Sequence, residues 1–208
     1  MPDDVWPEPA YVVRTKRLEL RCYERSDVAT VHEVILDNTE ALRPWMPWIQ
    51  HEPMSLEERG ELLRAFRARF DAGEDFIYGV FDRDGGAYIG GCGLHPRVGA
   101  RALEIGYWIA EDRWGQGLAT ELAAALTRVG FERMEAERME IRVVPHNTRS
   151  LAVPRKLGYT REGTLRGVLD RARDGRDDLV VFGMLLDELD ESPAAYAPIE
   201  LEGFLPDA

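Results

Sequence analysis

The sequence has few cysteines and no long apolar run. Its 208 residues include 2 cysteines, Cys22 and Cys92, which stand far apart without a CxxC pair or a neighbouring histidine. This pattern indicates neither a disulfide framework nor a zinc site. No stretch approaches the ~20 apolar residues of a membrane span, and the first residues lack the basic and apolar regions of a secretory signal. These absences predict a cytoplasmic protein with no membrane segment and no metal.

The chain also has a shortage of positive charge. Its 26 lysine and arginine residues face 38 aspartate and glutamate residues, which gives a formal net charge of −12. Binding to nucleic acid regardless of sequence depends on clustered lysine and arginine, so nucleic acid is a disfavoured partner. A cationic substrate such as an amine is compatible with this balance, although acidic proteins often owe only their solubility to it.

The length and the 45% hydrophobic content favour one domain with a full core. Residues 1–13 hold three prolines without periodicity, and residues 190–208 mix three prolines with acids. We expect both segments to lie outside the core. The sequence therefore predicts an N-terminal extension over residues 1–13, a domain over residues 14–187 and a C-terminal tail over residues 188–208.

The first half of the domain alternates between strand and helix patterns. Leu18, Leu20 and Cys22 alternate with polar residues, as in a half-buried strand, and Ser55 with Glu58 forms a capping box. The patterns predict a strand over residues 18–22, a helix from Ser26 or Asp27 to about Asp37, a helix from Ser55 to Gly73, and a hairpin of strands over residues 76–81 and 87–98.

The second half contains one strand–helix–strand unit. A strand over residues 103–109, a helix over residues 117–134 and a strand over residues 139–144 follow one another, so the two strands should be parallel and joined with right-handed sense. A short helix over residues 147–157 comes next, and strands over residues 159–169 and 179–186 pair across a polar turn at residues 173–176. The expected architecture is a mixed, mostly antiparallel sheet with one buried parallel pair.

The turn before the helix at residue 117 has the composition of a phosphate-binding site. Residues 114–121 read WGQGLATE, so Gly115 and Gly117 let backbone amides approach a ligand where the helix has unpaired N–H groups. Such amides suit a diphosphate, and each charge-assisted bond is worth about 1.5–3 kcal/mol. Glycines also occur in turns between strands and helices for conformation alone.

Two other phosphate-binding motifs fit less well. A dinucleotide fingerprint would need glycine where Thr120 stands, and five residues separate Ile109 from Gly115, which is too long for its tight turn. The flanking hairpins also differ from repeated βαβ units. A Walker loop is excluded because the Gly-Lys-Ser/Thr sequence is missing.

Together the motifs resemble the GNAT superfamily, and within it the ribosomal-protein N-terminal acetyltransferase (RimJ/RimL-like) branch. The resemblance covers roughly residues 14–187 and rests on the order and spacing of four segments: TKRLELR at residues 15–21, EIGYWI at 104–109 followed by WGQGLATE, NTRS at 147–150, and KLGY at 156–159. It implies an α+β fold with a twisted sheet of about seven strands and one central parallel pair, flanked by about four helices. It also implies an acyl-CoA N-acyltransferase that uses acetyl-CoA as its acyl donor.

The same resemblance assigns cofactor contacts. It implies that the backbone of Tyr107, Trp108 and Ile109 pairs with the pantetheine arm and that Asn147 contacts the cofactor. The pyrophosphate would be held by Gly115, Gln116, Gly117, Leu118, Ala119 and Thr120. The usual arginine or glutamine at the head of the RxxGxG/A pattern is Trp114 here, so any guanidinium contact must come from elsewhere.

Candidates for acid and base chemistry are fewer. Many members of the superfamily carry a tyrosine acid seven positions after the asparagine, where this chain has Pro154. RimL-like members have a serine three positions after it, which implies a catalytic role for Ser150, although serine also caps helices. As a hypothesis, Glu104 or Glu140 accepts the amine's proton through a water. A salt bridge is the alternative for either glutamate, and His146 is a further candidate base.

The missing strong base bears on the acceptor. A lysine amine is roughly 2.5 pH units harder to deprotonate than an α-amine, or about 3.4 kcal/mol, which favours a protein N-terminus or a small aminoacyl or amino compound. The alternative is an acyl-CoA-binding sensor or assembly module without turnover. The resemblance also implies a homodimer.

Overall fold

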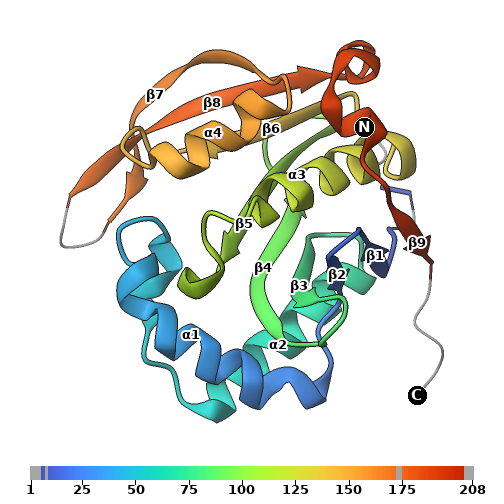
Figure 1. Ribbon diagram of the computed structural model, residues 1–208. Helices are drawn as coiled ribbons and strands as arrows, with labels where there is room; N and C mark the ends of the chain where they lie inside the picture. The colour runs from blue at the N-terminus through green and yellow to red at the C-terminus, as the bar shows by residue number, and fades with distance from the viewer. Residues whose placement is uncertain (1–5, 8, 172–174, 204–208) are drawn as a thin grey trace.

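The computed structural model describes residues 6–7, 9–171 and 175–203, which form one mixed sheet with helices on both faces (Figure 1). The described strands are β1 (Val12–Arg14), β2 (Leu18–Arg21), β3 (Phe76–Asp82), β4 (Tyr88–His95), β5 (Ala102–Ile109), β6 (Arg138–Val143), β7 (Thr160–Asp170), β8 (Arg176–Leu185) and β9 (Glu200–Glu202). The described α-helices are α1 (Val28–Leu42), α2 (Leu56–Asp71), α3 (Leu118–Arg128) and α4 (Thr148–Lys156).

The sheet has the strand order β7-β8-β6-β5-β4-β3-β2-β1-β9. The pairs between described strands are antiparallel except for β5 with β6, which is parallel, as the strand–helix–strand unit predicts. This parallel pairing is short, because it joins only residues 102–104 to residues 138–140. Beyond Glu104 and Glu140 the two strands part, and the backbone groups that face the gap between them do not bond across it.

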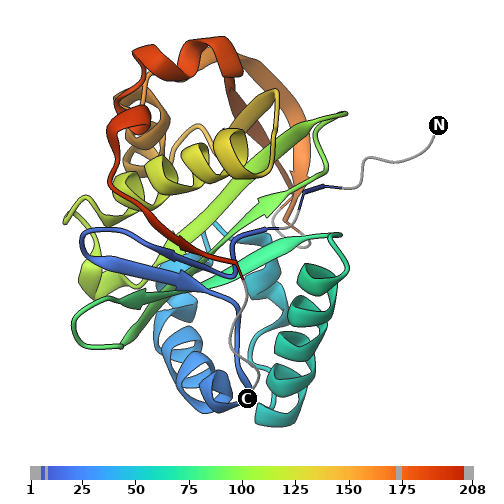
Figure 2. The ribbon, with the colours of Figure 1, turned by 90° about the vertical axis from the view of Figure 1, so that its right-hand side faces the viewer.

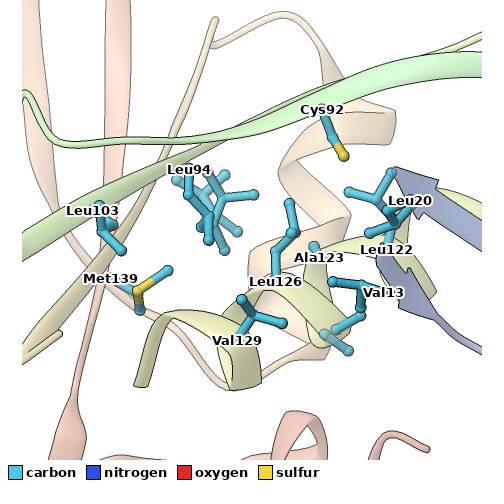
Figure 3. Close-up of a cluster of buried hydrophobic side chains, with 14 of the residues drawn as sticks. Val13, Leu20, Cys92, Leu94, Leu103, Leu122, Ala123, Leu126, Val129 and Met139 are labelled. Carbon is cyan, nitrogen blue, oxygen red and sulfur yellow. The ribbon is translucent and has the colours of Figure 1, made fainter. Parts of the chain in front are cut away.

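Two layers of helix cover the sheet. Figure 2 shows α3 above the sheet and α1 with α2 below it. Leu122, Leu126 and Val129 face the sheet and pack in one buried cluster with Leu103 and Met139 (Figure 3). Residues of α1 and α2 belong to a second cluster on the other face, with Tyr23, Phe81 and Tyr88. The two clusters contact β5 from opposite sides, since Leu103 belongs to the first and Trp108 packs against the second.

Local sequence signals account for several helix ends. Ser55 Oγ accepts from the backbone N–H of Glu58 at 3.2 Å, and the Glu58 carboxylate accepts from the N–H of Ser55 at 2.7 Å, so the capping box is confirmed. The helix expected over residues 117–134 ends at Arg128 and is followed by one π-helical turn over Val129–Arg133. Helix α1 runs to Leu42 rather than to Asp37, because Asn38 is buried and bonds within the helix.

The sheet has nine described strands rather than about seven. The additional strands β1 and β9 pair with each other at one edge. The expectation that both ends of the chain lie outside the core is wrong for residues 10–13 and for Ala194, which are buried. The division at residues 13 and 187 stays a prediction. In the polar turn expected at residues 173–176, residues 173 and 174 lie outside the described residues.

Within the described ranges, none of the helices is long and apolar enough to cross a membrane.

Candidate active site

A cleft of about 610 Å³ opens where β5 and β6 part. The end of β5, the turn before α3, the first turn of α4 and the end of α1 surround it. Its lining includes nine of the ten residues expected to bind the cofactor, with Gln116 as the exception, and it includes Ser150. The motifs at residues 104–109, 114–121 and 147–150 therefore meet at one place.

The turn before α3 is built on glycine. Gly115 has φ +76° and Gly117 has φ +80°, a left-handed conformation that side chains rarely adopt. Gly117 caps α3, and its carbonyl accepts from the N–H groups of Thr120 and Glu121. The N–H groups of Leu118 and Ala119 therefore lack partners within the helix, and both residues line the cleft. The geometry fits a diphosphate bound by backbone amides and the positive end of the helix.

The segment from Thr15 to Arg17 braces this turn. Arg17 Nη1 donates to the carbonyl of Gln116 at 2.9 Å, and Arg17 Nε donates to Glu121 at 2.7 Å. Thr15 Oγ1 donates to the same carboxylate at 2.6 Å. Burial raises the pKa of Glu121, but the hydrogen bonds from Thr15 and Arg17 outweigh it and lower the pKa below its ordinary value. The TKRLELR segment thus contacts the glycine turn at residues 115–117 and the first turns of α3 through side chains.

Positive charge reaches the cleft from residues that the sequence did not single out. Arg113, Arg149 and Lys156 line it. The Arg149 guanidinium lies 4.8 Å from the centre of the Trp114 ring, within the range of a cation–π contact. Trp114, which replaces the usual arginine or glutamine, therefore holds a guanidinium instead of supplying one. Arg149 lies within the NTRS segment, so the sequence could have indicated it as a source of positive charge at the cleft.

Two hydroxyl groups meet at the same cleft. Tyr107 Oη on β5 lies 3.0 Å from Ser150 Oγ on α4. Asn147 Oδ1 accepts from the Ser150 N–H at 3.1 Å and so caps α4. Capping therefore belongs to Asn147, and the Ser150 side chain is left facing Tyr107. Burial raises the pKa of Tyr107 to about 12, against a smaller opposing effect of the bond with Ser150.

The two glutamates proposed as bases lie elsewhere. Glu104 and Glu140 are paired across the parallel strands and are not among the cleft's lining residues. Side chains alternate along a strand, so Glu104 and Tyr107 point to opposite faces of β5. Both carboxylates are buried, at 8% and 5% exposure.

Arginines neutralise these carboxylates. Glu104 accepts from Arg97 at 2.8 and 2.9 Å, and Glu140 accepts from Arg138 at 2.7 Å and from Arg142 at 2.9 Å. Arg142 also lies 3.9 Å from Glu104, so the five side chains form one ion-pair ladder across the sheet. The salt-bridge alternative is present in the structure, and a base role for either glutamate stays a prediction.

The far end of the cleft is apolar and aromatic. Leu42, Trp45 and Met46 line it, and the ring of His146 lies 5.3 Å from that of Trp45. No aspartate or glutamate lines the cleft within the described part of the chain. His95 Nδ1 lies 2.6 Å from Asp75 Oδ1, but both residues line a separate pocket of about 310 Å³. The two residues stand 20 positions apart, and no sequence motif indicated their contact.

Among the described residues, no group of three or more histidine, cysteine or acidic side chains is placed to hold a metal ion.

Comparison with known proteins defines the class. Residues 17–160 match the family model of the acetyltransferase (GNAT) domain. The chain belongs to the GNAT family of acetyltransferases. It is an acyl-CoA N-acyltransferase, and acetyl-CoA is its acyl donor.

Similar proteins come from several bacteria. The [ribosomal protein uS5]-alanine N-acetyltransferase of Escherichia coli is 27% identical over 167 residues, which cover 77% of this chain and 84% of that protein. The structure of Mycobacterium smegmatis RimJ in complex with CoA-disulfide is 26% identical, with a TM-score of 0.76, and covers 91% of this chain and 93% of RimJ. The fold is also that of RimL, the ribosomal L7/L12 alpha-N-protein acetyltransferase, at a TM-score of 0.75 and 24% identity over 85% of this chain and 98% of RimL.

Proposed function

We propose that this protein transfers the acetyl group of acetyl-CoA to the α-amine at the N-terminus of a protein, by direct attack of the amine while both substrates are bound. The observation that carries this proposal is the composition of the cleft, where the described lining includes no carboxylate. A site without a carboxylate base suits an amine that is partly neutral at physiological pH.

The cost of deprotonation separates the two amines that a protein substrate offers. An α-amine ionises near pH 8, so roughly one molecule in ten is neutral at pH 7, whereas a lysine amine ionises near pH 10.4. The difference amounts to about 3.4 kcal/mol. An α-amine can therefore attack after losing its proton to water, and the protein's task is to position it.

The apolar end of the cleft supports an N-terminal residue with an uncharged side chain. Leu42, Trp45 and Met46 offer packing surface but no charge to pair with an acidic or basic side chain. The E. coli relative is named for an alanine of ribosomal protein uS5, and RimL is named for an alpha-N-protein substrate. Both names support a protein N-terminus as the acceptor, and a ribosomal protein is the class to test first.

The roles of the chain's own residues follow from their places. We assign the pantetheine arm to the backbone of Tyr107–Ile109, which faces the gap between β5 and β6, and the pyrophosphate to residues 115–120. Arg149 and Lys156 supply positive charge beside that turn. Asn147 holds the start of α4, and Ser150 offers a hydrogen bond to the departing sulfur.

A peptide panel tests the acceptor. Peptides with a free N-terminus and no lysine, matched peptides with a blocked N-terminus and one lysine, and small amines are each incubated with acetyl-CoA. Free thiol is measured, and mass spectrometry locates the acetyl group. We expect modification of the α-amine with a kcat/KM at least ~100-fold above that for the lysine peptides, in line with the 3.4 kcal/mol difference. Preferential acetylation of the blocked lysine peptide, or of a small amine, contradicts the proposal.

The two glutamates need a separate test. Glu104→Gln and Glu140→Gln remove the ability to take up a proton while keeping a polar group of similar size. If kcat of both variants stays above about one-third of wild type, the base role is excluded and positioning of the amine is sufficient. A larger loss in either variant would restore the carboxylate as the base.

A further inference from the structure

The contact between Tyr107 and Ser150 joins the two sides of the gap. Tyr107 is on β5 and Ser150 is in the first turn of α4, and both line the cleft. Their hydroxyl oxygens lie 3.0 Å apart. Among the described residues, Tyr107 is the hydrogen-bond partner of Ser150 Oγ.

Either hydroxyl can donate in this hydrogen bond, and the choice decides where the serine proton points. Tyr107 Oη has a second acceptor within reach, the Ser150 carbonyl, but at 3.5 Å that contact is at the outer limit for a hydrogen bond. A serine hydroxyl carries one proton and two acceptor sites. When Tyr107 donates to Ser150 Oγ, the serine proton is free to point into the cleft. Tyr107 is protonated at neutral pH, as a phenol ordinarily is, and burial raises its pKa further, to about 12.

We propose that Tyr107 is a positioning residue that makes Ser150 a directed hydrogen-bond donor to the sulfur leaving from acetyl-CoA. This inference rests on the proposed function, which assigns Ser150 to that sulfur. It gives a physical role to Tyr107, which enters the cleft from β5. The tyrosine acid that many members of the superfamily carry seven positions after the asparagine is replaced in this chain by Pro154.

Ordinary pKa values indicate whether the hydroxyl pair only donates a hydrogen bond to the leaving thiolate or transfers a proton to it. As the amine attacks, a C–N bond forms, the C–S bond breaks with its electron pair on sulfur, and the ammonium proton passes to water. Thiols ionise near pH 8.5 and phenols near pH 10, so transfer of a proton from tyrosine to the thiolate is unfavourable even without burial. The hydroxyl pair therefore stabilises the thiolate and keeps its protons, and the thiol is completed from solvent.

A titration of bound CoA tests this directly and does not depend on turnover. The ultraviolet absorbance of the thiolate reports ionisation of the CoA thiol in complexes with wild type, Tyr107→Phe and Ser150→Ala. Loss of the donor should raise the pKa of the bound thiol by about 1–2 pH units in Ser150→Ala and by up to about 1 unit in Tyr107→Phe. The Kd of acetyl-CoA should stay within about two-fold, because backbone groups hold the cofactor.

Tyr159→Phe is the matched control. The Tyr159 hydroxyl also bonds a hydroxyl, Thr127 Oγ1 at 2.7 Å, and Tyr159 is also buried. Tyr159 is not among the residues that line the cleft. Its replacement removes an equivalent bond and should leave the pKa of the bound thiol unchanged.

Kinetics provide the second readout. Tyr107→Phe should lower kcat by about five- to thirty-fold with little change in the KM for acetyl-CoA, and Ser150→Ala should lower kcat further. Because Tyr107 acts through Ser150, the double variant should match Ser150→Ala alone.

The outcomes separate the inference from the proposal beneath it. The inference fails if Tyr107→Phe behaves like Tyr159→Phe in the titration, or if the losses in kcat multiply in the double variant. An unchanged kcat and thiol pKa in Ser150→Ala would instead remove Ser150 from the mechanism. Acetylation of α-amines, which the peptide panel measures, would stand in either case.

Discussion

The two faces of β5 carry polar groups that are used in opposite ways. On one face, Glu104 belongs to a ladder in which every carboxylate bonds an arginine. On the other face, Tyr107 and Ser150 are uncharged, and both border the cleft. The charged groups satisfy one another, whereas the neutral groups retain a donor for a ligand. Strong charge in the middle of the sheet therefore does not mark where chemistry is expected.

This difference makes the two faces separable by mutation. Changes in the ladder should act mainly on stability, because they leave buried charge without a partner. Changes at the cleft should act mainly on kinetic constants. The predictions below run from the largest expected effect to the smallest.

Glu140→Ala should cause the largest change in stability. Glu140 bonds two arginines and is 5% exposed, so its removal takes one of two carboxylate partners from Arg138 and leaves Arg142 with only the longer contact to Glu104. We expect a loss of about 2–3 kcal/mol in the free energy of unfolding, less than for a fully buried pair because both arginines are partly exposed. Urea denaturation measures it. Glu162→Ala removes an exposed partner of the same Arg138 and should cost less than about 1 kcal/mol. Equal losses of unfolding free energy in Glu140→Ala and Glu162→Ala would contradict the view that Glu140 is the main carboxylate of the ladder.

Gly117→Ala should have the next largest effect, on cofactor affinity. Alanine at φ +80° is strained by about 1–2 kcal/mol, and relief of that strain displaces the amides at the start of α3. The KM for acetyl-CoA should rise about ten-fold. Gly73→Ala is the control, since Gly73 has φ +72° at the end of α2, away from the cleft. It should lose similar stability with an unchanged KM, and a rise in KM there would show that the strain acts globally.

Arg17→Ala should have a smaller and more selective effect. Loss of the bond to Gln116 O loosens the turn that we assign to the pyrophosphate, so the KM for acetyl-CoA should rise about five-fold. S-acetylpantetheine lacks the diphosphate, and its kcat/KM should not change. Arg14→Ala, which breaks a bond to Glu19 on the neighbouring strand, is the matched control. Equal losses of kcat/KM in Arg17→Ala with acetyl-CoA and with S-acetylpantetheine would mean that Arg17 only supports the fold.

The pH dependence of Glu121 should be the smallest effect. Its pKa is lowered from the ordinary value of 4.5 in the folded protein. A lowered folded-state pKa contributes stability that is fully present above pH 4.5 and is lost as the pH falls through the folded-state value. The stability difference between wild type and Glu121→Gln should therefore narrow below about pH 4.5. A difference that is constant between pH 3 and pH 7 would show that this carboxylate does not titrate with unfolding.

The parts of the molecule built from contiguous backbone were accessible from the sequence. The capping box at Ser55, the glycine turn at residues 115–117 and the parallel pair around α3 each depend on neighbouring residues, and the structure confirms them. Strands β1 and β9 were missed because they have three residues each, too few to show a period. Helix α1 was expected to end at about Asp37, but it continues to Leu42. Asn38, although polar, is buried within it.

The side-chain arrangements at the site were less accessible. Arg17 contacts Glu121 across 104 positions, and Tyr107 contacts Ser150 across 43. Such contacts depend on how elements pack, which no local pattern encodes. Glu104 and Glu140 were correctly placed on neighbouring strands. Arg138 and Arg142 flank Glu140 on the same face of β6, so strand alternation could have indicated their pairing, whereas Arg97 pairs with Glu104 from outside the two strands.

The short pairing between β5 and β6 has a consequence for the lifetime of the protein. Only three residue pairs join these strands, against six between β4 and β5 and six between β6 and β8 on either side, so the sheet is weakly connected at this point. A ligand that binds in the gap only when the chain is folded adds about 2.7 kcal/mol of stability at a concentration one hundred times its Kd. Amide hydrogen exchange along β5 beyond Glu104 should therefore slow as acetyl-CoA is added, and resistance to proteolysis should follow the supply of this protein's own substrate.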